Sequence, residues 1–471
     1  MTTHLARTAF TYPLQTPSWF AGHMAKSLNQ LPALLEEVDL VLEARDARLP
    51  LTSVNPAFDN VLEHVWGHSG AGPDRHGKGK EKLVVYTKRD LAEQRYEAPL
   101  RRAFQNLTGQ RVQFADSTVD SNVRAVLKAA VNIAKERGET LTDLKVLVVG
   151  MPNVGKSSLL NALRRVGVKK GKAFTTGATP GVTRKLTGTV KVYEKPNVYV
   201  FDTPGVMVPY LGKGEVGAER GLKLALTAGI KTGLFEEEVV ADYLLYKMNL
   251  RLAAEEMVGS DHRHAPYTQF LGLQATAASD DLNEFLESLA ARLGGLKKGG
   301  ALDTESALTY LLRVFREGKL GPWTLDDLDG AEEAYIEKYG EERAPEANMR
   351  YSELGAVGVT PATDLIEEPP IDLGDGPEPP ASTPIVQAAV QNVEAEGGVT
   401  PVHLSLDQRV MLSVSRFMDQ LAEQKADEEA GRNRSPTQVK KQERREKLEE
   451  RRKKSEAKRQ RQKAALASAR R

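Results

Sequence analysis

Hydrophobic and polar positions follow two patterns along the first 200 residues. Short apolar runs, of the kind that form buried parallel strands, alternate with stretches whose apolar residues recur at helical spacing. Five of these runs end in a loop of small or charged residues: VDLVLEARDA at 38–47, KLVVYTKRD at 82–90, RVQFADST at 111–118, LKVLVVG at 144–150 and NVYVFDTPG at 197–205. Strands that alternate with helices in this way predict an α/β domain around a mostly parallel sheet with flanking helices.

Beyond this domain the pattern changes three times. From about residue 210 to 325 the apolar residues recur at helical spacing, which predicts an all-α domain. Residues 360–401 contain eight acidic residues, many prolines and no Lys or Arg, a composition typical of disordered linkers. The chain is therefore expected to consist of a leader at 1–18, the α/β domain at 19–209, a small helical domain at 210–335, an acidic Pro-rich linker at 350–402, a short amphipathic helix at 403–425 and a basic tail at 426–471.

Two segments carry composition signals of their own. No acidic residue occurs before Glu36, a bias that transit peptides show, although an ordinary disordered leader can have the same composition. The block GHSGAGPDRHGKGKE at 67–81 is rich in glycine and charge, which predicts a surface insertion between two strands.

The composition excludes several functional classes. The 471 residues are 40% hydrophobic and 27% charged, and no apolar run approaches the roughly 20 residues that span a bilayer. The absence of cysteine excludes disulfides, thiolate metal sites and cysteine nucleophiles. The net charge of +1 hides an asymmetry, since residues 432–471 carry 17 basic and 5 acidic side chains and the remainder carries 48 and 59. The tail is therefore expected to contact a polyanion such as RNA, without sequence readout.

The sequence GMPNVGKS at 150–157 has the spacing of a phosphate-binding loop between a strand and a helix. Gly150 and Gly155 allow the backbone to wrap around phosphates, whose charge is met by amide N–H groups and the helix N-terminus. Lys156 is expected to reach the β- and γ-phosphates, and Ser157 to ligate Mg²⁺. The other nucleotide contacts expected from this loop are Asn153, Val154 and Ser158.

The next strand ends in FDTPG at 201–205, about forty residues after the phosphate loop. Asp202 is expected to hold Mg²⁺ through a water molecule, and the Gly205 N–H to sense the γ-phosphate. Between the two motifs, GATPGVTR places Thr183 where a mobile switch loop completes the Mg²⁺ shell, and Thr179 competes for this role.

The loops that follow two earlier strands are candidates for base recognition. Asp90, at the end of TKRD, can accept two hydrogen bonds from N1–H and N2 of guanine, a donor pair that adenine lacks. The stem of Lys88 can cover the ring face, and the backbone N–H groups of Asp116, Ser117 and Thr118 can reach the guanine O6. An ATP site is the alternative. In a parallel sheet all these loops lie at the same edge, so their order along the chain does not prevent a common site.

The order TKRD, DST, GMPNVGKS, PGVT, DTPG resembles that of the circularly permuted GTPases of ribosome assembly. WFAGHMAKSLNQL at 19–31 and VDLVLEARDARLPLTSVNP at 38–56 are similar to the YlqF/RbgA branch and its mitochondrial members. GLKLALTAGIK at 221–231 and FREGKLG at 315–321 extend the likeness into the helical domain, so that it covers roughly residues 19–325.

The resemblance implies roles for further residues. Val206 stands where many GTPases have a catalytic Gln, and His23 matches the family's proposed substitute, although a structural histidine is an alternative. Asn153 matches the asparagine that coordinates K⁺ in potassium-stimulated relatives, with a loop-shaping residue as the alternative. The family's base-recognition loop usually begins with Asn, whose amide ties it to the phosphate loop. Thr87 keeps a hydroxyl but lacks that amide, so we expect GTP specificity to persist through Asp90 with a weaker or altered hold on the base.

The resemblance also implies a function: GTP hydrolysis coupled to maturation of the large ribosomal subunit, with rRNA binding. The expected cofactors are GTP as substrate, Mg²⁺ and K⁺. The expected location is the mitochondrial matrix, with peripheral association at the inner membrane and a monomeric state, and a cytoplasmic or nucleolar protein is the alternative. An RNA-binding assembly scaffold with incidental nucleotide turnover is the alternative of another class.

Overall fold

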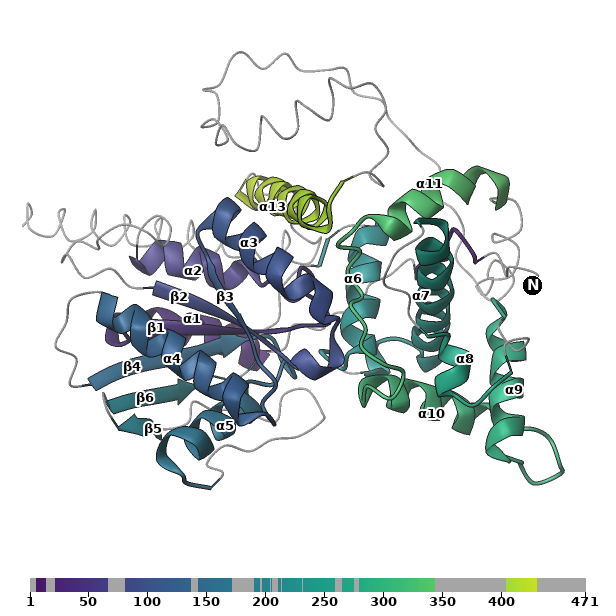
Figure 1. Ribbon diagram of the computed structural model, residues 1–471, viewed down its shortest axis with the longest axis horizontal. Coiled ribbons are helices and arrows are strands. Elements are labelled where there is room, and N and C mark those ends of the chain that lie inside the picture. Colours follow the sequence, from purple (N-terminus) through teal and green to yellow (C-terminus); the bar gives the residue numbers. More distant parts are fainter. Residues whose placement is uncertain are drawn as a thin grey trace, which may run out of the picture. The chain divides into compact units, whose positions relative to one another are not determined.

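The computed structural model confirms the predicted α/β sheet (Figure 1). Six strands lie in the order β3-β2-β1-β4-β6-β5, all parallel except β5, which runs antiparallel to β6. The strands are β1 Leu40–Asp46, β2 Glu81–Thr87, β3 Arg111–Phe114, β4 Asp143–Gly150, β5 Val190–Glu194 and β6 Asn197–Asp202. The structure describes residues 6–13, 22–66, 81–136, 143–171, 190–194, 197–203, 205, 211–212, 214–230, 232–258, 265–274, 279–343 and 404–429.

Helices cover both faces of the sheet, and alternate residues of the strands pack against them. Val41 and Leu147 belong to the cluster that includes Leu35 of α1 and Phe58 of α2, while Leu42 belongs to the one packed under α4 and α5. Figure 1 shows α4 and α5 together on one face. The helices of this region are α1 Gly22–Glu37, α2 Pro56–Trp66, α3 Glu97–Thr108, α4 Asp120–Glu136 and α5 Lys156–Val168.

Strand β1 is buried along its whole length, including its charged residues. Glu43 lies 2.7 Å from Arg45 Nε and 3.0 Å from Lys82 Nζ. Arg45 is further covered by aromatic rings, with its guanidinium 5.9 Å from the ring of Tyr86 and 5.6 Å from that of Phe104. Burial alone would raise the pKa of Glu43, but Arg45 and Lys82 lower it to about 2. The charged end of this apolar run is therefore part of the strand's interior packing.

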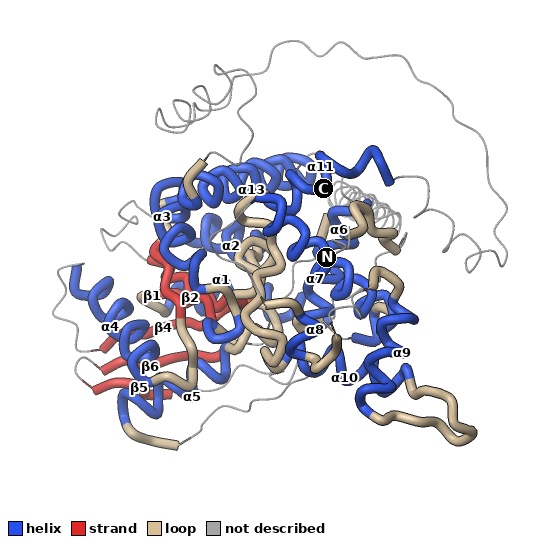
Figure 2. The backbone as a smooth tube through the Cα atoms, turned by 45° about the vertical axis from the view of Figure 1, so that its right-hand side comes forward, coloured by secondary structure: helices blue, strands red, loops and turns tan. Residues whose placement is uncertain are grey.

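The described residues that follow the sheet form helices and loops, as the periodicity indicated (Figure 2). The loop before α11 contacts the loop that follows β1. The Asp326 carboxylate accepts from Leu51 N at 2.8 Å, Thr52 N at 3.0 Å and Thr52 Oγ1 at 2.6 Å, and Leu325 N donates to Arg48 O at 2.9 Å. The helices are α6 Gly214–Leu226, α7 Glu237–Val258, α8 Tyr267–Phe270, α9 Leu282–Leu293, α10 Thr304–Arg316 and α11 Ala331–Arg343.

The described part of the leader, residues 6–13, packs against α7. Ala6 and Phe10 are buried, and the Phe10 ring lies edge-on to that of Tyr243 at 5.3 Å. The Arg7 guanidinium pairs with Asp242 at 2.8 Å. These residues contribute to the core of the helical region, a role that the composition of the leader did not indicate.

Helix α13, Leu406–Glu429, lies where the short amphipathic helix was expected. The chain divides into two compact units at Ser415, so only the first part of α13 belongs with the sheet and the helices described above. In that part Val410 and Val414 are buried, and Ser413 Oγ donates to Leu328 O at 3.0 Å. Residues 67–80 of the insertion expected at 67–81, the acidic linker and the tail beyond residue 429 lie outside the described residues, whereas Glu81 begins β2. No helix within the described ranges is long and apolar enough to cross a membrane.

Candidate nucleotide-binding site

Five loops follow the carboxyl ends of parallel strands and therefore lie at one edge of the sheet (Figure 1). Along the chain both candidate base loops precede the phosphate loop, which is the fourth of the five. In the sheet, β1 lies between β2 and β4, so the first candidate base loop is only one strand away from the phosphate loop. The loops follow β1 at residues 46–55, β2 at 87–90, β3 at 115–118, β4 at 150–155 and β6 at 203–205.

The phosphate loop is shaped by its backbone. Gly150 has φ +146°, and a Cβ there would lie 2.3 Å from Ala44 O, so only glycine fits beside β1. Asn153 and Gly155 also have positive φ, at 55° and 98°. Helix α5 begins directly after them, at Lys156. The loop thus turns sharply into a helix N-terminus, where backbone N–H groups can meet an anion.

Lys156 is buried, and its ammonium donates to Gly150 O at 3.0 Å and Met151 O at 2.7 Å. Its charge is therefore held over the loop that would receive phosphates. Ser157 and Ser158 follow in the first turn of α5, and Val154 is buried. The Asn153 side-chain amide donates to Ala228 O at 2.9 Å, which connects the phosphate loop to the turn after α6.

The loop after β2 is joined to the phosphate loop through Thr87. This buried residue ends β2, and its hydroxyl contacts Val154 O and lies 3.0 Å from Arg45 O. A connection between the two loops therefore exists without the amide of an asparagine. The physical reason is that Thr87 points its hydroxyl at a backbone carbonyl, which needs only one donor.

Lys88 has a left-handed backbone, with φ 54°, and its ammonium lies 2.8 Å from Asp46 Oδ2. Asp46 is buried at the end of β1 and pairs with Arg48 Nη2, also at 2.8 Å. Burial alone would raise the pKa of Asp46, but the two cations hold it well below its usual range. Our sequence reasoning missed Asp46 and Arg48. The pattern that could have indicated these two residues is the charged sequence RDAR at the end of the first strand, because this strand ends at the same sheet edge as the other loops.

Asp90 lies exposed in a short 3-10 turn, Arg89–Leu91. Although the side chain is exposed, partial desolvation by the surrounding protein and the nearby Asp116 raise the pKa of its carboxyl. A carboxylate in this electrostatic setting is stabilised by N–H donors, which the edge of a guanine base provides.

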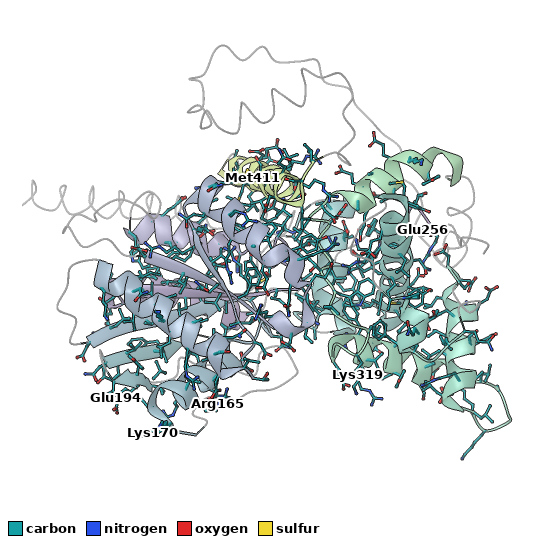
Figure 3. The ribbon with its side chains drawn as sticks, viewed as in Figure 1. Arg165, Lys170, Glu194, Glu256, Lys319 and Met411 are labelled. Atoms are coloured by element: carbon teal, nitrogen blue, oxygen red, sulfur yellow. The ribbon has the colours of Figure 1, made fainter. Side chains whose placement is uncertain are left out.

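The loop after β3 is fixed by side chains at both ends. Asp116 Oδ1 accepts from Thr118 N and Thr118 Oγ1, each at 2.7 Å, which closes a tight turn. Arg165, labelled in Figure 3, reaches from α5 and donates to Ser117 O at 3.1 Å. The helix that begins at the phosphate loop therefore also supports the second candidate base loop.

The loop after β6 touches the phosphate loop. Thr203 Oγ1 donates to Val148 O at 2.8 Å, and a Cβ on buried Gly205 would lie 2.6 Å from Pro152 Cα. The backbone of Asp202 ends β6, whereas its side chain, Thr179, Thr183 and Val206 lie outside the described residues. His23 is in the first turn of α1, but its side chain also lies outside the described part.

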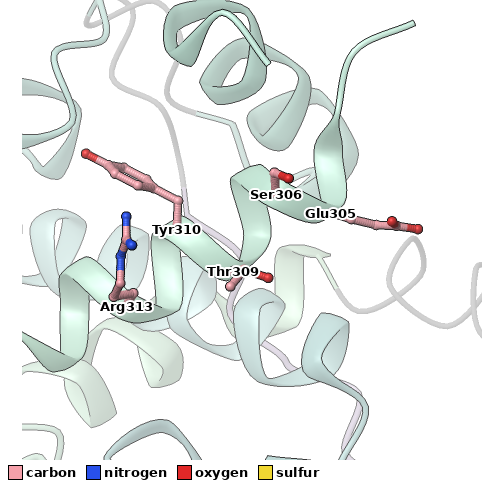
Figure 4. Close-up of a pocket in the computed structure, with 5 residues that line it drawn as sticks. All are labelled: Glu305, Ser306, Thr309, Tyr310 and Arg313. Atoms are coloured by element: carbon pink, nitrogen blue, oxygen red, sulfur yellow. The ribbon is translucent and has the colours of Figure 1, made fainter. Parts of the chain in front are cut away.

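These residues fit a nucleoside triphosphate with Mg²⁺. Phosphates would be met by the sharp loop at Gly150, the buried ammonium of Lys156 and the start of α5. The hydroxyl of Ser157 is a ligand of the kind that Mg²⁺ takes in such loops. A separate shallow pocket of about 270 Å³ lies along α10, lined by Glu305, Ser306, Thr309, Tyr310 and Arg313 (Figure 4). None of the nucleotide-site residues lines this pocket, so it is separate from the nucleotide site.

Comparisons with known proteins find GTPases among the relatives of this chain. The family of 50S ribosome-binding GTPases matches residues 145–256, starting in β4 and leaving the candidate base loops before the matched region. The chain is 34% identical over 323 residues to mitochondrial ribosome-associated GTPase 1 of Xenopus tropicalis, covering 65% of this chain and 94% of that protein. It is 29% identical over 315 residues to ribosome biogenesis GTPase A of Bacillus cereus, covering 65% and 93%. The crystal structure of GNP-bound YlqF from T. maritima is 22% identical with a TM-score of 0.36, covering 63% and 95%.

Proposed function

Because the chain belongs to the YlqF/RbgA family of circularly permuted GTPases, we propose that it uses GTP hydrolysis as a switch in assembly of the large mitochondrial ribosomal subunit. Membership confirms the predicted family, its P-loop GTPase fold and GTP hydrolysis. The observation that carries the proposal is the contact of the Thr87 hydroxyl with Val154 O, across 67 residues of sequence. It joins the candidate base loop to the phosphate loop in one site.

Each described loop has a role in this proposal. Asp90 accepts from the guanine edge, Lys88 covers the ring, and the backbone N–H groups of 116–118 reach O6. Lys156, Asn153, Val154, Gly155 and the first serines of α5 hold the phosphates, and Gly205 senses the γ-phosphate. Phosphoryl transfer depends on positioning and charge neutralisation, which this constellation supplies.

Further residues are proposed to bind metal ions and to assist hydrolysis. Mg²⁺, held by Ser157, Thr183 and Asp202, neutralises phosphate charge when bound. Asn153 is proposed as a K⁺ ligand and His23 as the residue that orients the attacking water, since the valine at 206 has no group that can do so.

The proposed partner is the large ribosomal subunit and its rRNA, because the relatives' names link them to ribosomes and the tail is strongly basic. The proposed location is the mitochondrial matrix, with peripheral contact to the inner membrane and a monomeric state. Imaging a fluorescent fusion with and without residues 1–18 tests the location, and an unchanged pattern would contradict import by that leader.

The function is tested by GTP hydrolysis with and without large mitochondrial subunits, in K⁺ and in Na⁺. We expect the subunits to stimulate hydrolysis at least tenfold in wild type, Lys156→Ala to abolish it, and His23→Ala to remove most of the stimulation. Lys170→Ala, at the exposed end after α5, is the matched control and should leave hydrolysis unchanged.

Two outcomes would redirect the proposal. No stimulation, together with normal subunit assembly supported by Lys156→Ala, would indicate a scaffold whose nucleotide turnover is incidental. Unchanged base preference in Asp90→Asn would remove the guanine-recognition role of residues 87–90, because the altered side chain should favour xanthine over guanine.

A further inference from the structure

The buried carboxylate of Asp46 joins two cations from different loops. Its Oδ1 accepts from Arg48 N at 3.0 Å and Arg48 Nε at 3.1 Å, and its Oδ2 from Arg48 Nη2 and Lys88 Nζ, each at 2.8 Å. The side chains of Asp46 and Arg48 are only 4% and 3% exposed, whereas that of Lys88 is 24% exposed.

The two partners of Asp46 differ in how firmly the rest of the fold holds them. Arg48 also donates from Nη2 to Thr227 O at 3.4 Å, and its own carbonyl accepts from Leu325 N at 2.9 Å. Lys88 has its backbone fixed in the left-handed region and its ammonium fixed on Asp46, so both ends of its stem are held. The methylene groups of the stem therefore run between the left-handed backbone and the ammonium held by the buried carboxylate.

We propose that Asp46 is a positioning residue for base recognition: it holds the Lys88 stem extended as a preformed apolar surface for the purine ring. The proposal rests on the proposed assignment of residues 87–90 to base recognition. A free lysine side chain loses much rotamer entropy when it is ordered, and ordering it before the ligand arrives removes that cost from binding. Asp46 touches no base in this scheme and acts through Lys88.

The first test measures affinities for GDP and IDP, which lacks the 2-amino group. We expect Asp46→Asn to weaken both about tenfold and by the same factor, because the ring surface is lost while the donor-reading Asp90 stays. In a Lys88→Met background, Asp46→Asn should have no further effect, since the residue it acts through is gone. An equal loss in both backgrounds would show a merely structural role and overturn the proposal.

Two single variants keep the proposal testable if Asp46→Asn does not fold. Lys88→Met, which retains an unbranched apolar stem, should lose the same factor for GDP and IDP, and wild-type affinity would contradict the proposal. Lys88→Arg can still reach Asp46 and should retain affinity within about threefold.

The matched control is Glu43→Gln, which removes another buried carboxylate from the same strand and should leave GDP affinity of the folded protein unchanged. If residues 87–90 do not recognise the base at all, Asp90→Asn will leave the ratio of GDP to XDP affinity unchanged. This outcome distinguishes failure of the proposed function from failure of the role of Asp46. A changed ratio with additive Asp46 and Lys88 effects would overturn only the role of Asp46.

Discussion

The base-recognition half and the phosphate half of the site are built by different means. The phosphate loop is shaped by backbone conformation within a few residues, with positive φ at Gly150, Asn153 and Gly155. The base loop depends on side chains that meet across the sequence: Thr87 contacts Val154 over 67 residues and Lys88 pairs with Asp46 over 42. The conformation of the phosphate loop therefore depends on nearby residues in the sequence. The base loop takes its conformation only when the strands β1, β2 and β4 lie side by side in the sheet.

The strands beneath the two halves differ as well. Strand β4 carries a run of buried apolar residues, from Val146 to Val149, up to the phosphate loop. Strand β1 carries Glu43, Arg45 and Asp46, all buried and paired. Buried ion pairs are costly to break because removing one partner leaves an uncompensated charge. The base half is therefore expected to be sensitive to pH, and the phosphate half to backbone substitution.

The largest expected effect comes from breaking the backbone of the phosphate loop. Gly150→Ala places a Cβ 2.3 Å from Ala44 O at φ +146°, so either β1 or the loop must shift. We expect a loss of about 3 kcal/mol or more in unfolding free energy and at least a hundredfold loss of GDP affinity. Urea unfolding and fluorescence titration with a labelled GDP measure the two.

Gly109→Ala is the matched control. This glycine also has positive φ, at +67°, but a Cβ there would meet nothing within 4 Å. Only the left-handed penalty applies, about 1 kcal/mol, with unchanged GDP affinity. Equal effects of the two substitutions would show that the approach to Ala44 does not shape the loop.

The same division decides what the sequence alone could predict. Roles for Gly150, Gly155 and Lys156 could be predicted because they depend on spacing within one loop, and the parallel sheet could be predicted from short apolar runs. Asp46 and Arg48 were missed because nothing local says that RDAR pairs with a lysine 42 residues later. The contact of Thr87 with Val154 was not predicted for the same reason, since its partner carbonyl belongs to another strand's loop. The packing of Phe10 against α7 likewise depends on a distant surface.

The buried charges of β1 should make stability depend on pH. The pKa of Glu43 is lowered to about 2 when folded, so its ion pair contributes stability above the ordinary pKa near 4.5 and loses it as pH falls toward 2. Glu43→Gln should lower the unfolding free energy by about 3 kcal/mol at pH 7, and the difference from wild type should shrink below pH about 4.

Urea unfolding at pH 7, 5 and 3 measures this dependence. Glu287→Gln, on the exposed side of α9, is the control and should track wild type at every pH. If the difference in unfolding free energy between wild type and Glu43→Gln stays constant from pH 7 to 3, the ion pair of Glu43 is not the cause of the destabilisation.

The smallest expected effect tests the junction between the two halves. Thr87→Val keeps the shape of a buried residue but removes the hydroxyl that contacts Val154 O and lies 3.0 Å from Arg45 O. Leaving a buried carbonyl without its donor costs about 1–2 kcal/mol, and we expect GDP affinity to fall about fivefold as the base loop and phosphate loop lose their connection. Thr108→Val is the control, because its hydroxyl donates to Phe104 O at 2.7 Å within its own helix, away from the site. It should leave GDP affinity unchanged, so matching affinities in the two valine variants would show that the halves are held together by the sheet and not by this hydroxyl.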